Sequence, residues 1–184
     1  MAADDVSTLA TIPLDPSPYE WQSPNKATKV PEDVFPGEHA ICVPDGFMSR
    51  DGQSGHVYIM VQEKDDIFDT NRTVRLTEHI ENYWYTSECH WVDMNGDGRK
   101  DLLIARARTY FDEGRLIWLE QPDESALDGD IAWKEHVIGE GPDGDISWDV
   151  LPQYPDEIIV WSTMPSEKEL TLYRVSTIDG SLVG

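Results

Sequence analysis

The sequence is short of positive charge. Its 184 residues include 14 lysines and arginines against 36 aspartates and glutamates, which gives a formal net charge of −22. Nucleic acid is bound by basic surfaces that displace counterions from phosphates, and anionic membranes attract basic segments. We therefore expect the protein to bind neither nucleic acid nor an anionic membrane surface.

Long apolar runs are missing as well. No stretch approaches the roughly 18 consecutive apolar residues of a transmembrane helix, so we expect no membrane span. The first six residues are acidic and lack the basic start and apolar stretch of a signal peptide. If the protein is exported, we expect this chain to be a processed form.

Asn71-Arg72-Thr73 is a glycosylation sequon, which makes Asn71 a candidate site, although short chains often contain this pattern by chance.

Cysteine is scarce, with Cys42 and Cys89 the two in the chain. They could form a disulfide in an oxidising compartment or remain two buried thiols in a reducing one. The residues alone leave both possibilities open.

Residues 1–36 are interrupted by prolines, which disfavour helices and central strands. We expect this segment to be a proline-rich N-terminal arm, an extended tail that Tyr19 and Trp21 could anchor to the folded part. The prolines are Pro13, Pro16, Pro18, Pro24, Pro31 and Pro36.

From about residue 37, short apolar runs alternate with turn residues. The runs contain β-branched or aromatic residues and are flanked by Gly, Asp or Pro, which is typical of strands. No stretch keeps a 3.6-residue period over three turns. The runs are residues 57–61, 102–105, 115–119, 158–161 and 170–173. We predict an all-β chain.

Parts of the sequence recur about 57 residues apart. Residues 76–80 resemble residues 133–137, which places His79 and His136 in corresponding Glu-His pairs. Trp91 likewise corresponds to Trp148. A repeat near 50 residues that holds about four strands has the size of a propeller blade. The alternative is a β-sandwich with coincidental internal similarity.

The segment 93–101 carries the sharpest motif. Side-chain oxygens fall at its positions 1, 3, 5 and 9, and a backbone carbonyl is available at position 7. Hard oxygen donors on alternate residues of a tight loop can converge on one Ca²⁺, which takes six to eight oxygens. The residues in question are Asp93, Asn95, Asp97, Arg99 (carbonyl) and Asp101.

Two further positions define the kind of loop. Gly98 stands at position 6, where a sharp turn favours a residue without Cβ. Position 12 is Ile104 rather than the bidentate Glu of an EF-hand, and the flanks are strand-like, so the motif is not an EF-hand. The alternative is a surface turn that binds nothing.

Residues 91–105 resemble the repeat of integrin-type β-propellers, often called FG-GAP or VCBS repeats. In that family an Asp-x-Asn-x-Asp-Gly-x-x-Asp-Leu calcium loop joins the innermost strand of a blade to the next. Residues 114–122 and 133–138 are similar to the third and fourth strands of microbial and fungal members. The resemblance covers roughly residues 37–184 and is strong over 88–138. It implies a propeller fold and a Ca²⁺ held by Asp93, Asn95, Asp97, the Arg99 carbonyl and Asp101.

The resemblance also implies about three four-stranded blades, at about 37–80, 81–138 and 139–184, which make an incomplete ring because propellers typically have four to eight blades. The other two copies of the loop depart from the pattern, so we expect one calcium site. On this alignment Cys42 and Cys89 lie on the innermost strands of consecutive blades, which favours a disulfide. The first copy has Phe47, Ser49, Asp51, Gly52 and Gly55 at loop positions, and the third retains Asp149 and Asp156.

We predict a calcium-stabilised recognition module that binds a protein or a glycan, as this family mostly serves extracellular recognition. An extracellular or secreted location follows from the same resemblance. Tyr83, Trp84 and Tyr85 could stack on sugars, although packing between blades is the more common role for such a cluster. An incomplete ring implies a homo- or hetero-oligomer or the remainder of a longer chain.

The alternative function is the propeller part of a carbohydrate-active enzyme of the lyase or dehydratase type. His39 and His90 would be the candidate acid–base groups, but a lone histidine on a strand is more often structural. The sequence has no Ser/His/Asp order, CxxC pair, HExxH or phosphate-binding glycine loop. Catalytic residues therefore stay unassigned, and an enzyme is the less favoured hypothesis.

Overall fold

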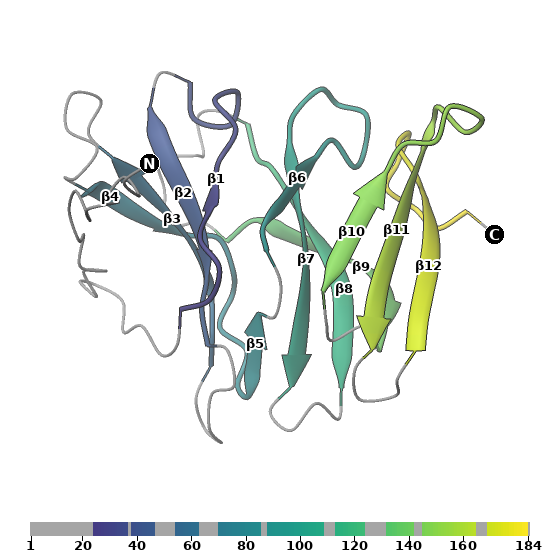
Figure 1. Ribbon diagram of the computed structural model, residues 1–184. Coiled ribbons are helices and arrows are strands. Elements are labelled where there is room, and N and C mark those ends of the chain that lie inside the picture. Colours follow the sequence, from purple (N-terminus) through teal and green to yellow (C-terminus); the bar gives the residue numbers. More distant parts are fainter. Residues whose placement is uncertain are drawn as a thin grey trace, which may run out of the picture.

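The computed structural model describes residues 24–36, 38–46, 54–62, 70–85, 88–108, 113–123, 132–141, 145–164 and 169–183. These residues form strands, turns and irregular segments, with no helix among them. The strands make three antiparallel sheets of four, five and three strands (Figure 1), and the described strands do not close into a barrel. The predicted all-β class is confirmed.

The first sheet begins inside the expected N-terminal arm. Thr28 and Lys29 pair with Cys42 and Ile41, and the residues that follow them pack into the core, where Phe35 is buried. A strand forms here because the prolines flank the paired residues and the strand lies at the edge of the sheet. In spatial order the strands are β1 (Thr28–Lys29), β2 (His39–Pro44), β3 (Val57–Gln62) and β4 (Thr70–Arg75).

The second sheet is built around its longest strand, β7. Two short strands, β5 and β6, follow each other along one edge of β7, and β8 pairs along the other edge. The five strands are β5 (Tyr83–Tyr85), β6 (His90–Val92), β7 (Asp101–Arg108), β8 (Gly114–Glu120) and β9 (Lys134–Glu140).

The third sheet is a three-stranded meander. Its central strand pairs with both neighbours in antiparallel register, so that Val160 lies opposite Trp148 on one side and Tyr173 on the other. After the last strand the chain turns back, and Leu182 forms a single bridge to Val175. The strands are β10 (Ile146–Asp149), β11 (Glu157–Met164) and β12 (Glu169–Ser176).

The sheets pack face to face through two apolar layers. Residues of β7 alternate between these layers, as the two-residue period of a strand requires. Leu102 and Ile104 belong to the layer shared with the first sheet, whereas Leu103 and Ala105 belong to the layer shared with the third. The second sheet is therefore buried on both faces, which explains why residues 102–105 of β7 form an unbroken apolar run.

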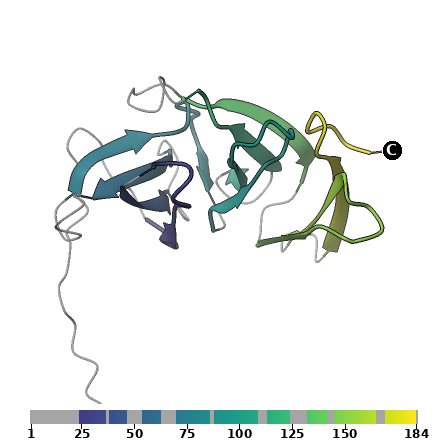
Figure 2. The same cartoon turned by 90° about the horizontal axis from the view of Figure 1, so that it is seen from above.

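Figure 2 shows the three sheets following one another along an arc, with the second sheet between the other two. Backbone hydrogen bonds also join the first two sheets. The Gly55 N–H donates to the Tyr83 carbonyl over 2.8 Å, and the Trp133 N–H donates to the Leu76 carbonyl over 2.8 Å. The first two sheets are thus held together by main-chain bonds as well as by their shared core.

Candidate functional site

The loop 93–100 connects β6 to β7 and lies at the upper end of the molecule in Figure 1. Its ends are fixed by the antiparallel pairing of Val92 with Asp101. The predicted donors therefore all lie in one hairpin connection, on the second sheet.

Alternate side chains of this loop are turned back onto its own backbone. The two carboxylate oxygens of Asp93 accept hydrogen bonds from the N–H groups of Gly96 (2.7 Å) and Gly98 (2.9 Å). Oδ1 of Asn95 accepts a hydrogen bond from the Asp97 N–H over 3.1 Å, and Oδ1 of Asp97 accepts one from the Arg99 N–H over 2.8 Å. These Asx-type turns coil the loop and hold three of the predicted oxygen donors against its backbone.

Two glycines make this coil possible. Gly96 and Gly98 have φ of +74° and +87°, in the left-handed region that glycine adopts without a steric penalty. Gly96 also abuts the third sheet, because a Cβ there would come within 2.3 Å of the Thr177 carbonyl oxygen, whereas Gly98 has no atom within 4 Å of such a Cβ. The sequence predicted the role of Gly98 but not the contact made by Gly96.

Asp101 closes the loop from below. It is fully buried, and its two oxygens accept hydrogen bonds from the N–H groups of Gln121 (2.8 Å) and Met94 (2.9 Å). Burial raises the pKa of Asp101 to about 6, although these two hydrogen bonds oppose the shift. A cation next to this carboxylate would favour its charged form.

The side chain of Arg99 ties the loop to the end of β8. Its guanidinium contacts the carboxylates of Asp97 (2.6 Å) and Asp123 (3.3 Å), and its Nε donates to the Gln121 carbonyl over 3.2 Å. The positive charge of Arg99 is thus paired with Asp97, one of the predicted calcium ligands, as well as with Asp123.

The donors have the chemistry of a calcium site, because all are oxygens and three are carboxylates. In the described part of the chain, however, no three His, Cys, Asp or Glu side chains are grouped in a way that could hold a metal ion. The carboxylates of Asp93 and Asp101 instead accept backbone hydrogen bonds with both oxygens. Calcium binding by Asp93, Asn95, Asp97, Arg99 and Asp101 stays a prediction.

The other two copies of the loop retain two carboxylates in the described residues. Phe47, Ser49, Asp51 and Gly52 lie outside them. Asp149 and Asp156 of the third copy are exposed, and Asp149 accepts a hydrogen bond from the N–H of the residue after it, over 2.8 Å.

Cys42 and Cys89 form a disulfide, with their Cα atoms 6.3 Å apart. Cys42 lies on β2 and Cys89 directly precedes β6, so the bond joins the first sheet to the second. Oγ1 of Thr28 donates to the Cys89 carbonyl over 3.5 Å beside it. The disulfide enters the core shared by these two sheets.

The aromatic cluster does not form a platform for sugars. Trp84 and Tyr85 are 1% and 2% exposed, and burial raises the pKa of Tyr85 to about 12. Tyr83 is partly exposed, donates to Glu113 over 2.8 Å and lies under the Arg106 guanidinium at 5.2 Å. Tyr85 packs in the core shared by the first two sheets, and Trp84 is buried as well.

The histidines are spread over the sheets. His39 is exposed at the start of β2, whereas His90 is half-buried on β6 and burial lowers its pKa. His136 stacks on Trp118 with ring centroids 3.9 Å apart and bonds Glu120 over 2.7 Å. His79 does not repeat this arrangement, because it is exposed after the end of β4.

Sequence reasoning missed His56, which is buried behind the first sheet. Its Nδ1 lies 3.1 Å from Oγ1 of Thr77, and burial lowers its pKa to about 4. No local pattern distinguishes this histidine, because its burial depends on strands that are distant in sequence.

Asn71, the candidate glycosylation site, lies on β4, and its side chain is outside the described residues.

Comparison with protein family models, curated protein sequences and solved structures finds no match for this chain. In the described residues no helix is long and apolar enough to cross a membrane.

Proposed function

We propose that the protein is a calcium-stabilised recognition module of the β-propeller type, in which the three sheets are three blades of an incomplete ring. The ligand is a protein or a glycan. In this proposal Asp93, Asn95, Asp97, the Arg99 carbonyl and Asp101 hold the ion, which rigidifies the loop and performs no chemistry.

The alternate oxygen-bearing side chains that bond the loop's own backbone carry this proposal. Asp93, Asn95 and Asp97 lie at alternate positions, and each bends back over the loop backbone. A loop that collects acidic side chains around itself benefits from a cation that neutralises them, and Ca²⁺ tolerates the irregular geometry of such oxygen sets. The positive φ values of Gly96 and Gly98 belong to the same coil.

The packing of the sheets supports the propeller part. In each of the second and third sheets, one set of alternating residues contacts the preceding sheet. The opposite set of the third sheet includes Leu170 and Leu172, which are 60% and 63% exposed. An apolar sheet face that is open to solvent favours association, in keeping with a module that belongs to an oligomer or a larger assembly.

The disulfide supports an extracellular or secreted location, because disulfides persist in oxidising compartments. It joins Cys42 to Cys89 across the first two sheets. The excess of acidic residues suits the same setting, where calcium is abundant.

The test is calcium titration by calorimetry, with metal content measured by elemental analysis. The variant Asp97→Asn keeps the size of the side chain and its oxygen acceptor but removes one charge, and we expect at least a tenfold loss of calcium affinity. The matched control is Asp149→Asn, at an exposed aspartate that also accepts a local backbone hydrogen bond, and it should bind calcium as the wild type does. Absence of bound calcium in the wild type would refute the proposal.

Recognition itself is tested on a glycan array and by capture of candidate extracellular proteins, with and without chelator. Binding that disappears on chelation supports a calcium-dependent module. Binding that is insensitive to chelation would separate recognition from the calcium loop.

A further inference from the structure

A second site lies on the opposite side of the second sheet from the third sheet. A pocket of about 210 Å³ opens between the segment that follows β4 and the start of β9. It is smaller than the pockets of drug-sized ligands and has the size of a single side-chain group. Its lining residues are Thr77, Glu78, Leu119, Ala132, Trp133, Lys134 and Glu135.

The walls of the pocket are fixed by the fold. The Trp133 N–H donates to the Leu76 carbonyl over 2.8 Å, which holds the two segments side by side. The Trp133 ring is buried and meets the edge of Trp91 at a centroid distance of 6.1 Å. Leu119 is also buried, so the apolar part of the lining is rigid.

Thr77 connects the lining of the pocket to a buried polar network, in which Tyr85 bonds both Thr77 and the Arg106 guanidinium. Oγ1 of Thr77 accepts a hydrogen bond from the Val57 N–H over 3.2 Å and contacts Nδ1 of His56 at 3.1 Å. Because burial lowers the pKa of His56 to about 4, the imidazole is neutral at physiological pH. The histidine that contacts Thr77 therefore adds no positive charge to this network.

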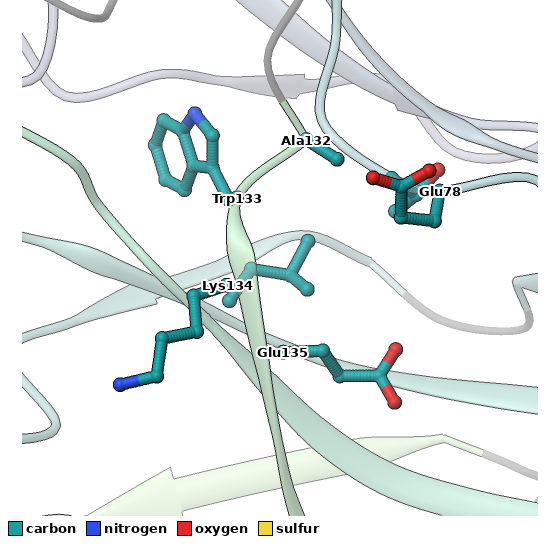
Figure 3. A pocket seen from close by; sticks show the side chains of 7 residues that line it. Glu78, Ala132, Trp133, Lys134 and Glu135 are labelled. Carbon is teal, nitrogen blue, oxygen red and sulfur yellow. The ribbon is translucent and has the colours of Figure 1, made fainter.

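The two carboxylates of the pocket face the same side. In Figure 3 Glu78 and Glu135 extend to one side of the strand, with the methyl group of Ala132 near Glu78, whereas Lys134 runs to the other side. The Lys134 ammonium is held by Glu120 at 3.0 Å. The pocket is therefore lined by two carboxylates, while its one lysine is paired outside it.

The charges of these two carboxylates are balanced differently. Glu135 forms an ion pair with Arg106, whose side chain is buried behind it. Glu78 is exposed, and among the described residues none forms an ion pair or hydrogen bond with its carboxylate. The pocket thus presents one uncompensated negative charge and the solvent-facing side of a second carboxylate, next to rigid apolar walls.

We propose that this pocket binds a guanidinium group, carried by an arginine side chain of a protein partner or by a small free guanidine. A guanidinium is planar, donates several hydrogen bonds to carboxylates and is weakly hydrated, so it tolerates apolar walls better than an ammonium does. The acidic protein as a whole, with its net charge of −22, attracts such cations. The site is independent of the proposed calcium loop.

The test is an NMR titration in the presence of chelator, which follows the Trp133 indole signal. The probes are N-acetyl-arginine amide and its neutral isostere N-acetyl-citrulline amide. We expect the arginine compound to bind at least tenfold more tightly and to shift the Trp133 signal. Equal binding of the two compounds, or no shift at Trp133, would overturn the proposal.

Two variants test whether binding needs the Glu78 carboxylate and the open volume beside Ala132. Glu78→Gln should weaken binding of the arginine compound about tenfold, whereas Glu81→Gln, at an exposed glutamate outside the pocket, should leave it unchanged. Ala132→Leu adds bulk in the pocket and should abolish binding while every charge is kept. Unchanged affinity in Glu78→Gln would contradict the proposed site.

Two further probes distinguish an arginine of a protein partner from a small free guanidine. They are ethylguanidinium and a pentapeptide with one central arginine flanked by glycines. Tighter binding of the peptide supports a protein partner, and equal binding supports a small free guanidine. Because these measurements are made without calcium, a failure to bind guanidinium leaves the calcium proposal intact. A failure to bind calcium likewise leaves the guanidinium proposal intact.

Discussion

Gly180 lies directly against the indole ring of Trp118. A Cβ at position 180 would come within 2.5 Å of Cζ2 of that ring, and the φ of Gly180 is +71°. This contact seats the turn that follows β12 on β8, so the end of the third sheet packs on the second. Trp118 is itself stacked on His136, with the ring planes 5° apart.

Replacement of Gly180 by alanine should therefore destabilise the fold. The positive φ costs about 1 kcal/mol with a Cβ, and overpacking against the ring adds about 1–3 kcal/mol. The control is Gly98→Ala, where φ is +87° but no atom lies within 4 Å of the added Cβ, so that the backbone effect alone remains. Urea unfolding in chelator measures both, and equal losses would show that the Trp118 contact contributes nothing.

The disulfide should contribute strongly to stability. It closes a loop with a sequence separation of 47 residues, for which the chain-entropy relation gives about 4 kcal/mol. We expect the free energy of unfolding to fall by about 2–4 kcal/mol when the protein is reduced. The double variant Cys42→Ala/Cys89→Ala, measured without reductant, should be destabilised at least as much, and it should show no further loss when reductant is added.

Buried His56 should make the protein less stable in mild acid. Its pKa is lowered from about 6.5 in the unfolded chain to about 4 in the fold, so between these values the unfolded state binds more protons. Stability is therefore lost as the pH falls from about 6.5 to about 4. The contribution of His56 is on the order of 3 kcal/mol, and urea unfolding at pH 7 and at pH 4.5 measures it together with the contributions of other titrating groups.

A matched variant isolates this effect from other groups. Asp101, whose pKa is raised to about 6, has the opposite influence, because the folded state binds more protons than the unfolded state between about 4 and 6. The variant His56→Asn removes the imidazole and leaves Asp101 in place. We expect the loss between pH 7 and 4.5 to be about 2–3 kcal/mol larger in the wild type than in this variant. The same pH dependence in both proteins would rule out His56 as the cause.

Local patterns predicted at least one strand in each of the three sheets, because all five predicted apolar runs lie within observed strands. The run 102–105 lies within β7, and the acidic segment after Trp91 is the hairpin loop that the spacing indicated. These features depend on neighbouring residues. The alternation of oxygen-bearing side chains is likewise local, which is why the Asx-type turns of Asp93, Asn95 and Asp97 follow the predicted spacing.

Contacts between residues that are distant in the sequence could not be predicted from local patterns. The Cys42–Cys89 pair followed from the family resemblance, not from the spacing of the two cysteines. The pairing of Thr28 with Cys42 placed a strand inside the expected arm. The pocket beside Trp133 needs the hydrogen bond to Leu76, between segments far apart in the sequence. Such contacts depend on which sheet faces pack together, and a single sequence does not encode that in any short pattern.

Calcium should stabilise the third sheet as well as the loop. Gly96 abuts the Thr177 carbonyl. Two backbone hydrogen bonds hold the turn after β12: the Thr177 N–H donates to the Asp156 carbonyl (2.9 Å), and the Gly180 N–H donates to the Ser176 carbonyl (2.9 Å). If the ion rigidifies the loop, this turn loses freedom too. At calcium concentrations about 100-fold above the dissociation constant we expect about 2.7 kcal/mol of stabilisation, which raises the melting temperature by about 5–10 °C.

Hydrogen exchange distinguishes this coupling from a purely local effect. With calcium, the amides of Gly96, Gly98, Thr177 and Gly180 should all exchange more slowly, because loop and turn pack on each other. In Asp97→Asn the same protection should require at least tenfold more calcium, whereas in Asp149→Asn it should appear at the wild-type calcium concentration. Slower exchange confined to residues 94–100 would mean that the loop binds calcium without bracing the third sheet, since the contact between Gly96 and Thr177 would then transmit no constraint.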